Sequence, residues 1–364
     1  MIRLRRGIVT ALGPARPGAH ELEVSVDGET ATAVAYPELT GPVAVGDVVV
    51  LNTTAVALGL GTGGVHLVIA RDGGRATEAE AEPEPPGRAM KLRYTPLQTV
   101  VDAVEESHRD AIEGTDLRQA PVVCAPLHSM VGPVAAGAKR AGKDVRVVYV
   151  MTDGAALPGP FSRLVTELRL ARLLDGWVTC GQAFGGDLEA VTVWSGMQAA
   201  VSILEADVIV VADGPGNMGT DTTWGVSALG SGTALNAAAT LGGRPIPALR
   251  VSFADRRDRH RGLSHHSRTI LRDVCLVETN VPVPVLADEG QRSAVWDALR
   301  ASDPEGRHHP VEVDGRPAQD ELEARSVEVR SMGRGFGDDP AFFLAAGAAG
   351  VLAGRLAAEG RRWR

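Results

Sequence analysis

Short runs of alternating apolar and polar positions fill the first 70 residues of the chain. They are rich in Val, are separated by Gly, Pro and Asp, and read GIVTAL, ELEVSV, ATAVAY, DVVVLN and VHLVIA. Evenly spaced short strands of this kind are typical of a small barrel or sandwich. The pattern therefore predicts a small all-β, barrel-like domain over residues 1–70.

The alternation gives way to an acidic stretch at residue 71. The segment RDGGRATEAEAEPEPPGRA contains repeated Glu, Pro and Gly and has no apolar periodicity. A segment of this composition cannot bury enough apolar surface to order itself, and it is typical of a linker. We therefore predict an acidic Pro/Gly linker over residues 71–90.

Longer apolar runs alternate with stretches of helical periodicity beyond residue 90. We predict strands at 121–127, 145–152, 177–182, 207–213, 247–253 and 273–279, and helices at 130–141, 160–174, 195–204 and 229–241. Helical stretches follow at 291–300 and 317–324, and a helix of small residues lies near the end of the chain. Continuous apolar strands alternating with helices indicate a parallel sheet covered on both faces. The prediction for residues 91–364 is an α/β domain with a doubly wound, mostly parallel sheet and a C-terminal helical extension.

Polar side chains stand where the predicted strands end, as His128, Asp153, Asp187 and Asp213 do. The carboxyl ends of parallel strands meet at one edge of a sheet, where ligands bind, so we expect these residues to converge. Asp153, Asp187 and Asp213 are then candidate catalytic acids and bases, and Asp153 with Asp213 is a candidate site for a divalent metal such as Mg²⁺. The alternative is that each Asp forms a turn or caps a helix, which strand–helix connections favour.

The loop DGPGNMGTDTT at 213–223 is the most informative motif. It lacks the P-loop pattern; its glycines match G-x-G-x-x-G by spacing, but no first strand of a dinucleotide-binding unit precedes it. Successive main-chain N–H groups and polar side chains suit the capture of a phosphate or carboxylate. The candidate ligand-binding residues are Gly214, Gly216, Asn217, Gly219, Thr220 and Thr222. The alternative is a purely structural loop.

A third constellation, DRRDRHRGLSHHSRT at 255–269, places His260, His265 and His266 among five arginines. His265 or His266 is a candidate for proton transfer or metal binding, and Arg261 or Arg256 is a candidate partner for an anionic substrate. Adjacent residues on a strand or helix point to different sides, so we expect only one of the paired histidines to face a site. The alternative is a solvated loop with Ser264 as a helix cap. His308 and His309 precede a proline and are predicted at the surface.

Composition limits the partners of this protein. Acidic residues (45) outnumber basic ones (37), and the net charge of −8 argues against nucleic acid and anionic membranes, whose binding needs clustered Lys and Arg. The apolar stretch 342–354 is well short of the ~20 residues of a spanning helix. Three scattered cysteines without a CxxC pair are typical of buried thiols in a reducing cytosol. We therefore expect a cytoplasmic homo-oligomer that binds a small anionic molecule and binds neither nucleic acid nor membrane.

Several long blocks of this sequence together resemble one protein family. They are LNTTAVALGLGTGG, KLRYTPLQ, VMTDGAALP, GQAFGGDLEAV, GPGNMGTDTTWG and RGLSHHS, and the resemblance covers nearly the whole chain. The sequence is similar to the domain of unknown function 3866 family, which consists of uncharacterised bacterial proteins common in actinobacteria. The resemblance implies a soluble bacterial protein with this layout, and it implies no catalytic residues.

The sequence favours an enzyme, a hydrolase or group transferase that acts on a phosphorylated or carboxylated small molecule at the carboxyl edge of the sheet. Redox chemistry fits less well, because neither a cysteine pair nor a full dinucleotide-binding unit is present. The alternative is a non-catalytic protein that senses a ligand or assembles with itself.

Overall fold

The computed structural model describes residues 2–59, 64–72, 87–142 and 144–361. The chain divides into two compact units, Met1–Val101 and Asp102–Arg364. Most of the predicted linker, residues 73–86, lies outside the described residues, so the domain boundaries at 70 and 90 stay a prediction.

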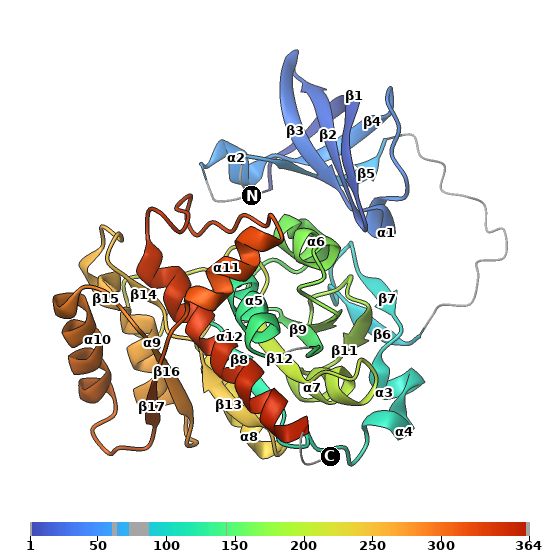
Figure 1. Cartoon of the computed structure of the whole chain (residues 1–364). Coiled ribbons are helices and arrows are strands. Elements are labelled where there is room, and N and C mark those ends of the chain that lie inside the picture. The colour runs from blue at the N-terminus through green and yellow to red at the C-terminus, as the bar shows by residue number, and fades with distance from the viewer. Residues whose placement is uncertain (1, 60–63, 73–86, 143, 362–364) are drawn as a thin grey trace. The chain divides into compact units, whose positions relative to one another are not determined.

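The first unit is built around a closed five-stranded barrel, as the alternating pattern predicts (Figure 1). Its strands are β1 (Leu4–Arg16), β2 (Ala19–Val26), β3 (Glu29–Ala35), β4 (Val48–Asn52) and β5 (His66–Arg71), in the order β1-β2-β3-β5-β4. Inward side chains such as Val9, Leu22 and Leu51 form its core, because alternate residues of a strand point to one face. The unit also holds the short helices α1 (Pro37–Thr40) and α2 (Thr54–Ala57) and a ribbon of β6 (Ala89–Lys91) and β7 (Thr99–Val101).

The second unit contains a six-stranded parallel sheet in the order β11-β10-β9-β12-β8-β13. The strands are β8 (Pro121–Cys124), β9 (Val147–Thr152), β10 (Gly176–Cys180), β11 (Leu188–Ala190), β12 (Val208–Asp213) and β13 (Arg244–Pro247). Tyr149 and Met151 pack toward one layer of helices, whereas Val148 and Val150 pack toward the other. Both sides of the central strands are therefore buried, which explains their continuous apolar runs.

Helices cover both faces of this sheet. One layer contains α5 (Val131–Ala141), α6 (Arg163–Leu170) and α12 (Pro340–Arg361), and the other contains α7 (Val193–Ser202) and α8 (Gly230–Thr240) beside α3 (Val104–Ser107) and α4 (Arg109–Ile112). The helices that follow β8 and β9 lie on one face, and the helix that follows β12 lies on the other. The connections therefore diverge beside the carboxyl end of β12, which is where sheets of this kind bind ligands.

A smaller subassembly follows β13. It consists of the hairpin β14 (Val251–Ser252) and β15 (Gly262–Leu263), the helices α9 (His265–Thr269) and α10 (Glu289–Ser302), and the parallel pair β16 (Asn280–Pro284) and β17 (His309–Val313). Helix α11 (Arg316–Ala324) packs instead on α5 and α12. Two of the predicted strands are wrong here. The run 247–253 is divided between β13 and β14, and 273–279 begins in a π-helical turn, Ile270–Val274, with the strand following at Asn280. His308 is also buried rather than at the surface, bonded to Thr279 and to the main chain of Leu271.

Helix α12 lies across α5, and glycines bring the two helices together (Figure 1). A Cβ added at Gly350 would lie 2.0 Å from the Val134 carbonyl oxygen, so no larger residue fits there without a shift. The helix is longer than the predicted stretch 342–354. It is the one helix in the described part of the chain that is long and apolar enough to cross a membrane. Because 72% of its apolar window is buried inside the unit, packing against the sheet accounts for its composition.

Candidate functional site

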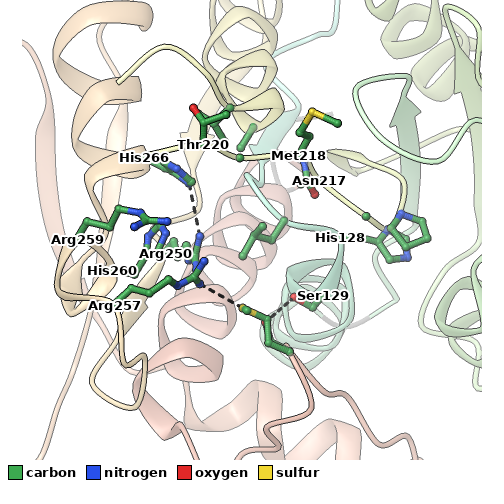
Figure 2. A pocket seen from close by; sticks show the side chains of 18 of the residues that line it. His128, Ser129, Asn217, Met218, Thr220, Arg250, Arg257, Arg259, His260 and His266 are labelled. Carbon is green, nitrogen blue, oxygen red and sulfur yellow. Dashed lines mark hydrogen bonds between the residues drawn. The ribbon is translucent and has the colours of Figure 1, made fainter. Parts of the chain in front are cut away.

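A cavity of about 450 Å³ opens beside the carboxyl ends of β8 and β12. Residues 127–129 after β8, 215–220 after β12, 250–266 after β13 and 330–332 before α12 provide most of its lining. Figure 2 shows Arg250, Arg257, Arg259, His260 and His266 gathered on one side of it and His128 on the other. A cavity of this size lies within the range that small-molecule sites occupy.

His128 is buried and lines the cavity, and both nitrogens of its ring have a hydrogen-bond partner. Its Nε2 lies 2.7 Å from Ser162 Oγ, and its Nδ1 lies 3.2 Å from the Asp213 carbonyl oxygen. Because a carbonyl oxygen only accepts, the Nδ1–H donates to it and the Ser162 hydroxyl donates to Nε2. Burial lowers the pKa of His128 to about 4, so the ring is neutral at pH 7. These bonds fix the orientation of the ring.

The buried carboxylate of Asp213, at the end of β12, joins two loops at the sheet edge. Its Oδ1 accepts hydrogen bonds from Thr152 Oγ1 at 2.6 Å and from Gly154 N at 3.1 Å, and its Oδ2 accepts one from Asn217 Nδ2 at 2.8 Å. Burial raises the pKa of Asp213, and these hydrogen bonds oppose the rise. A Cβ at Gly154 would come within 2.6 Å of both carboxylate oxygens, which explains the glycine there. Asp213 therefore positions the loop and does not itself line the cavity.

The glycine loop after β12 is held by its own side chains. Asn217 Nδ2 also donates to Ser227 Oγ at 3.1 Å, and the hydroxyls of Thr220 and Thr222 lie 2.8 Å apart. Gly216 has a φ of +94°, a conformation that other residues rarely adopt. The loop is thus fixed with residues 215–220 along the cavity.

Four arginines line the cavity: Arg250, Arg257, Arg259 and Arg330. Within the described part of the chain, no acidic residue lines it. Arg259 pairs with Asp221, which is 82% exposed, so this pair is weak and solvated. The Nε of Arg259 is buried and has no hydrogen-bond partner among the described residues. The cavity therefore presents positive charge to whatever enters it.

The carboxylate of Asp255 forms ion pairs with two of these arginines, Arg250 and Arg257. Its Oδ2 lies 3.2 Å from Arg250 Nη2 and 2.8 Å from Arg257 Nη2, and the carboxylate is almost fully buried. The hydrogen bond from Arg257 holds the pKa of Asp255 well below its usual range. Burial lowers the pKa of Arg250 to about 10, which leaves its guanidinium charged at pH 7. Both guanidinium groups are thus fixed in place.

His260, His265 and His266 form a cluster beside the arginines. His260 ends a 3₁₀ turn in the connection between β14 and β15. The chain then leads from β15 into α9, whose first turn carries His265 and His266. One ring nitrogen of each histidine lies within 4.8 Å of those of the other two. Of the two adjacent histidines, only His266 lines the cavity. The rings of His265 and His266 nevertheless lie 4.2 Å apart, and both lie close to His260.

Burial and the nearby arginines keep these histidines uncharged. Burial and the arginines lower the pKa of His260 to about 3 and also lower the pKa of His265. Burial, His265 and the arginines lower the pKa of His266 to about 3. A ring with a pKa so far below 7 is a weak general base, whereas a neutral imidazole is a good metal ligand. Proton transfer by His265 or His266 stays a prediction.

The structure brings some of the predicted residues to the cavity and leaves others away from it. Gly216, Asn217, Gly219, Thr220 and His266 line it, and His265 lies against His266; Gly214, Thr222, Asp213 and Arg261 do not line it. A Cβ at Gly214 would lie 2.4 Å from Met151 Cε, so packing explains that glycine. Thr222 bonds within the loop, and Arg261 is exposed outside the cavity.

Asp153 lies at the same edge of the sheet as Asp213, because Thr152 of β9 pairs with Asp213 of β12, whereas Asp187 does not lie at that edge. Asp153 is exposed and accepts a hydrogen bond from Gln182 N at 2.8 Å, as a turn-forming Asp does. Asp187 bonds Trp177 N at 3.0 Å, at the amino end of β10, and pairs with Arg169 at 2.5 Å. The loop after β10 returns to the amino edge of the sheet, so Asp187 lies just before β11 and not at the carboxyl end of β10. A Mg²⁺ site at Asp153 and Asp213 stays a prediction.

Several residues that line the cavity are not among the site residues predicted from the sequence. Arg250 had a visible signal, since it is the one charged residue in the apolar run PALRVSF and a buried charge needs a partner. Arg330, Ser331 and Met332 had none, because they lie far along the chain in an irregular segment. Ser129, whose hydroxyl donates to Ser331 Oγ at 3.1 Å, joins these distant segments.

The fold and the cavity define an α/β protein with a barrel unit and an arginine-lined cavity at the carboxyl edge of its parallel sheet. No curated protein matches the chain. The chain belongs to the family described as "Protein of unknown function (DUF3866)", whose model matches residues 32–350. The match confirms the family resemblance and includes part of the barrel unit as well as most of the α/β unit.

Proposed function

We propose that the cavity binds a small molecule carrying a phosphate or carboxylate group, and that the protein is a hydrolase or group transferase acting on it. The observation that carries this proposal is the lining itself: four arginines and no acidic side chain among the described residues that form it. Guanidinium groups recognise phosphate and carboxylate oxygens through paired hydrogen bonds. Fixed cations also stabilise the charge that develops on such oxygens during group transfer.

The remainder of the lining indicates the rest of the ligand. Leu127, Leu164 and Val226 supply apolar surface, and Met218 and Met332 are exposed beside them, at 74% and 64% of their full area. A bound molecule would place its anionic group against Arg250, Arg257 and Arg259 and an apolar or weakly polar body against these side chains. The protein therefore suits a phosphate or carboxylate ester better than a free inorganic ion.

A thermal-shift screen of the full-length chain against nucleotides, sugar phosphates, phosphate esters and carboxylic acids tests the proposal. A ligand at about 100 times its Kd adds about 2.7 kcal/mol to the free energy of unfolding. Arg259→Gln and Arg330→Gln should each lose most of this stabilisation. The acids with which these arginines pair, Asp221 and Glu328, are exposed, so the variants should still fold.

The same segment of the chain provides the matched controls. Arg256 and Arg261 are exposed and do not line the cavity, so Arg256→Gln and Arg261→Gln remove the same charge without touching the ligand. Stabilisation lost equally in all four variants would indicate a general charge effect and would contradict the proposal.

Turnover is the second readout. Compounds that stabilise the protein are incubated with it and their hydrolysis or transfer products are measured. Binding that depends on Arg259 without any product would favour the alternative function, a non-catalytic ligand sensor. That alternative is supported by the arginines Arg250 and Arg257, whose bonds to Asp255 suit a rigid binding site as well as a catalytic one.

A further inference from the structure

We infer that His260, His265 and His266 bind a divalent transition metal ion of the zinc class at the wall of the cavity. This inference goes beyond the proposed function, because it depends on the histidines and not on the arginines. Two observations carry it: the mutual position of the three rings, and two buried ring nitrogens of the cluster that have no hydrogen-bond partner among the described residues.

The three rings are close enough to share one ion. Their nearest ligand nitrogens lie within 4.8 Å of one another. Three nitrogens bound to one tetrahedral zinc ion at about 2.0–2.1 Å lie roughly 3.4 Å apart. Each nitrogen therefore has to move by an ångström or so, which small rotations of the histidine side chains supply.

Two of the nitrogens have no other role. The Nε2 atoms of His265 and His266 are buried, and neither finds a hydrogen-bond partner in the described part of the chain. His266 is only 5% exposed, so its Nε2 cannot be satisfied by bulk water. A buried polar atom without a partner is costly, and a metal ion bound there removes that cost.

The third histidine is held as metal-bound histidines usually are. His260 Nδ1 lies 2.8 Å from the hydroxyl of Ser264, which is fully buried and also accepts a hydrogen bond from His266 N at 3.3 Å. When Nδ1 donates to that oxygen, Nε2 is left with a free lone pair for a metal. Ser264 thus positions His260 and the first turn of α9 together.

The donor set selects the kind of metal. Imidazole nitrogens suit Zn²⁺, Co²⁺, Ni²⁺ and Cu²⁺, whereas Mg²⁺ and Ca²⁺ prefer oxygen. His260 and His266 line the cavity, so the fourth position of a tetrahedral ion would face it and would take water or an anionic oxygen. An ion with three protein ligands and one open position has the arrangement of catalytic rather than structural zinc sites.

Metal binding to the full-length chain tests this inference. The protein is expressed without a histidine tag, stripped with a chelator and titrated with Zn²⁺ and Co²⁺ in a buffer free of multivalent anions. The expected result is one equivalent of either metal, with the visible absorption of tetrahedral Co²⁺. His265→Gln and, as a second variant, His260→Gln should weaken binding by at least about tenfold and remove that absorption. His265 is only partly buried, so its variant should fold.

His309→Gln is the control, because His309 is exposed and lies outside the cluster. Failure of the wild-type chain to bind one equivalent would overturn the inference, and so would equal binding by the wild type and both cluster variants. Since no multivalent anion is present, this result is independent of the arginine-dependent ligand binding described above. Failure of either proposal therefore leaves the other testable.

Discussion

The carboxylate of Asp255 and the guanidinium group of Arg257 form a two-bonded pair. Nε donates to Oδ1 at 3.0 Å and Nη2 donates to Oδ2 at 2.8 Å, while Arg250 approaches Oδ2 at 3.2 Å from the other side. The pair is anchored further by Ser252, whose hydroxyl accepts a hydrogen bond from Asp255 N at 3.1 Å. One buried acid therefore fixes two of the arginines on the cavity wall.

Asp255→Asn should destabilise the protein strongly. The substitution leaves the buried guanidinium of Arg250 without its charge partner, and breaking such a pair typically costs about 3–5 kcal/mol. Asp221→Asn is the matched control, because it breaks the pair between Arg259 and an exposed acid and should cost less than about 1 kcal/mol. Urea denaturation of both variants measures the difference. Equal effects would mean that the Asp255 pairs contribute no more than a surface ion pair.

The contact between α12 and α5 gives a second stability prediction. Gly350→Ala places a Cβ 2.0 Å from the Val134 carbonyl oxygen, so the helices must separate, and overpacking of this kind costs about 1–3 kcal/mol. Gly360→Ala lies on the same helix with no atom within 4 Å of the added Cβ. It should be neutral or stabilise by about 0.5–1 kcal/mol. Thermal unfolding of the two variants separates packing from helix propensity, and a stable Gly350→Ala would show that this interface is loose.

The barrel and the parallel sheet could be predicted because local patterns specify them. The runs that form β8, β9, β10 and β12 are mainly apolar, as strands buried on both faces must be. The run 273–279 is predicted as a strand, but its apolar residues lie in a helical turn and a loop. Cys275 packs against one helix layer, while Leu276 is exposed. Only the tertiary setting distinguishes that arrangement from a strand.

The candidate site was only partly predictable. The glycine loop and the histidine segment have local signatures, so Asn217, Thr220 and His266 were found. Arg250, Arg257 and Arg330 come together through β13, the β14–β15 hairpin and the segment before α12, and no local pattern reports such contacts. The sequence predicts Asp187 at the carboxyl edge of the sheet. The parallel strands β10 and β11 are joined without a helix, so their connecting loop ends at the amino edge, with Asp187 just before β11.

The neutral state of His128 predicts acid sensitivity. Its pKa of about 4 in the folded chain lies below the ordinary value of 6.5. Between these values the unfolded chain binds a proton that the folded chain does not, so the free energy of unfolding falls as pH drops through this window. The loss is about 3 kcal/mol, since each pKa unit corresponds to about 1.4 kcal/mol.

His128→Gln removes this titration and checks the sign. Its destabilisation relative to the wild type should be largest near neutral pH and should shrink toward about pH 4, as the wild type loses the advantage of its neutral ring. Denaturant unfolding at several pH values measures the difference. His309→Gln, at an exposed histidine, should show no such trend. A difference independent of pH would mean that His128 titrates normally in the folded chain.

The arginines and the histidine cluster together predict that metal and anion reinforce each other's binding. Three neutral imidazoles do not neutralise the charge of a bound Zn²⁺. The ion would therefore repel the guanidinium group of Arg250, which is hydrogen-bonded to His266 Nδ1 at 3.5 Å. An anion in the cavity offsets this repulsion. Sulfate, which does not precipitate zinc, should therefore raise the affinity for Zn²⁺ by at least about fivefold. By reciprocity, Zn²⁺ should raise the affinity for sulfate by the same factor. Calorimetric titrations in both orders measure the two factors, and Arg259→Gln should reduce both. Competition between zinc and sulfate would instead place the two ligands at one overlapping position.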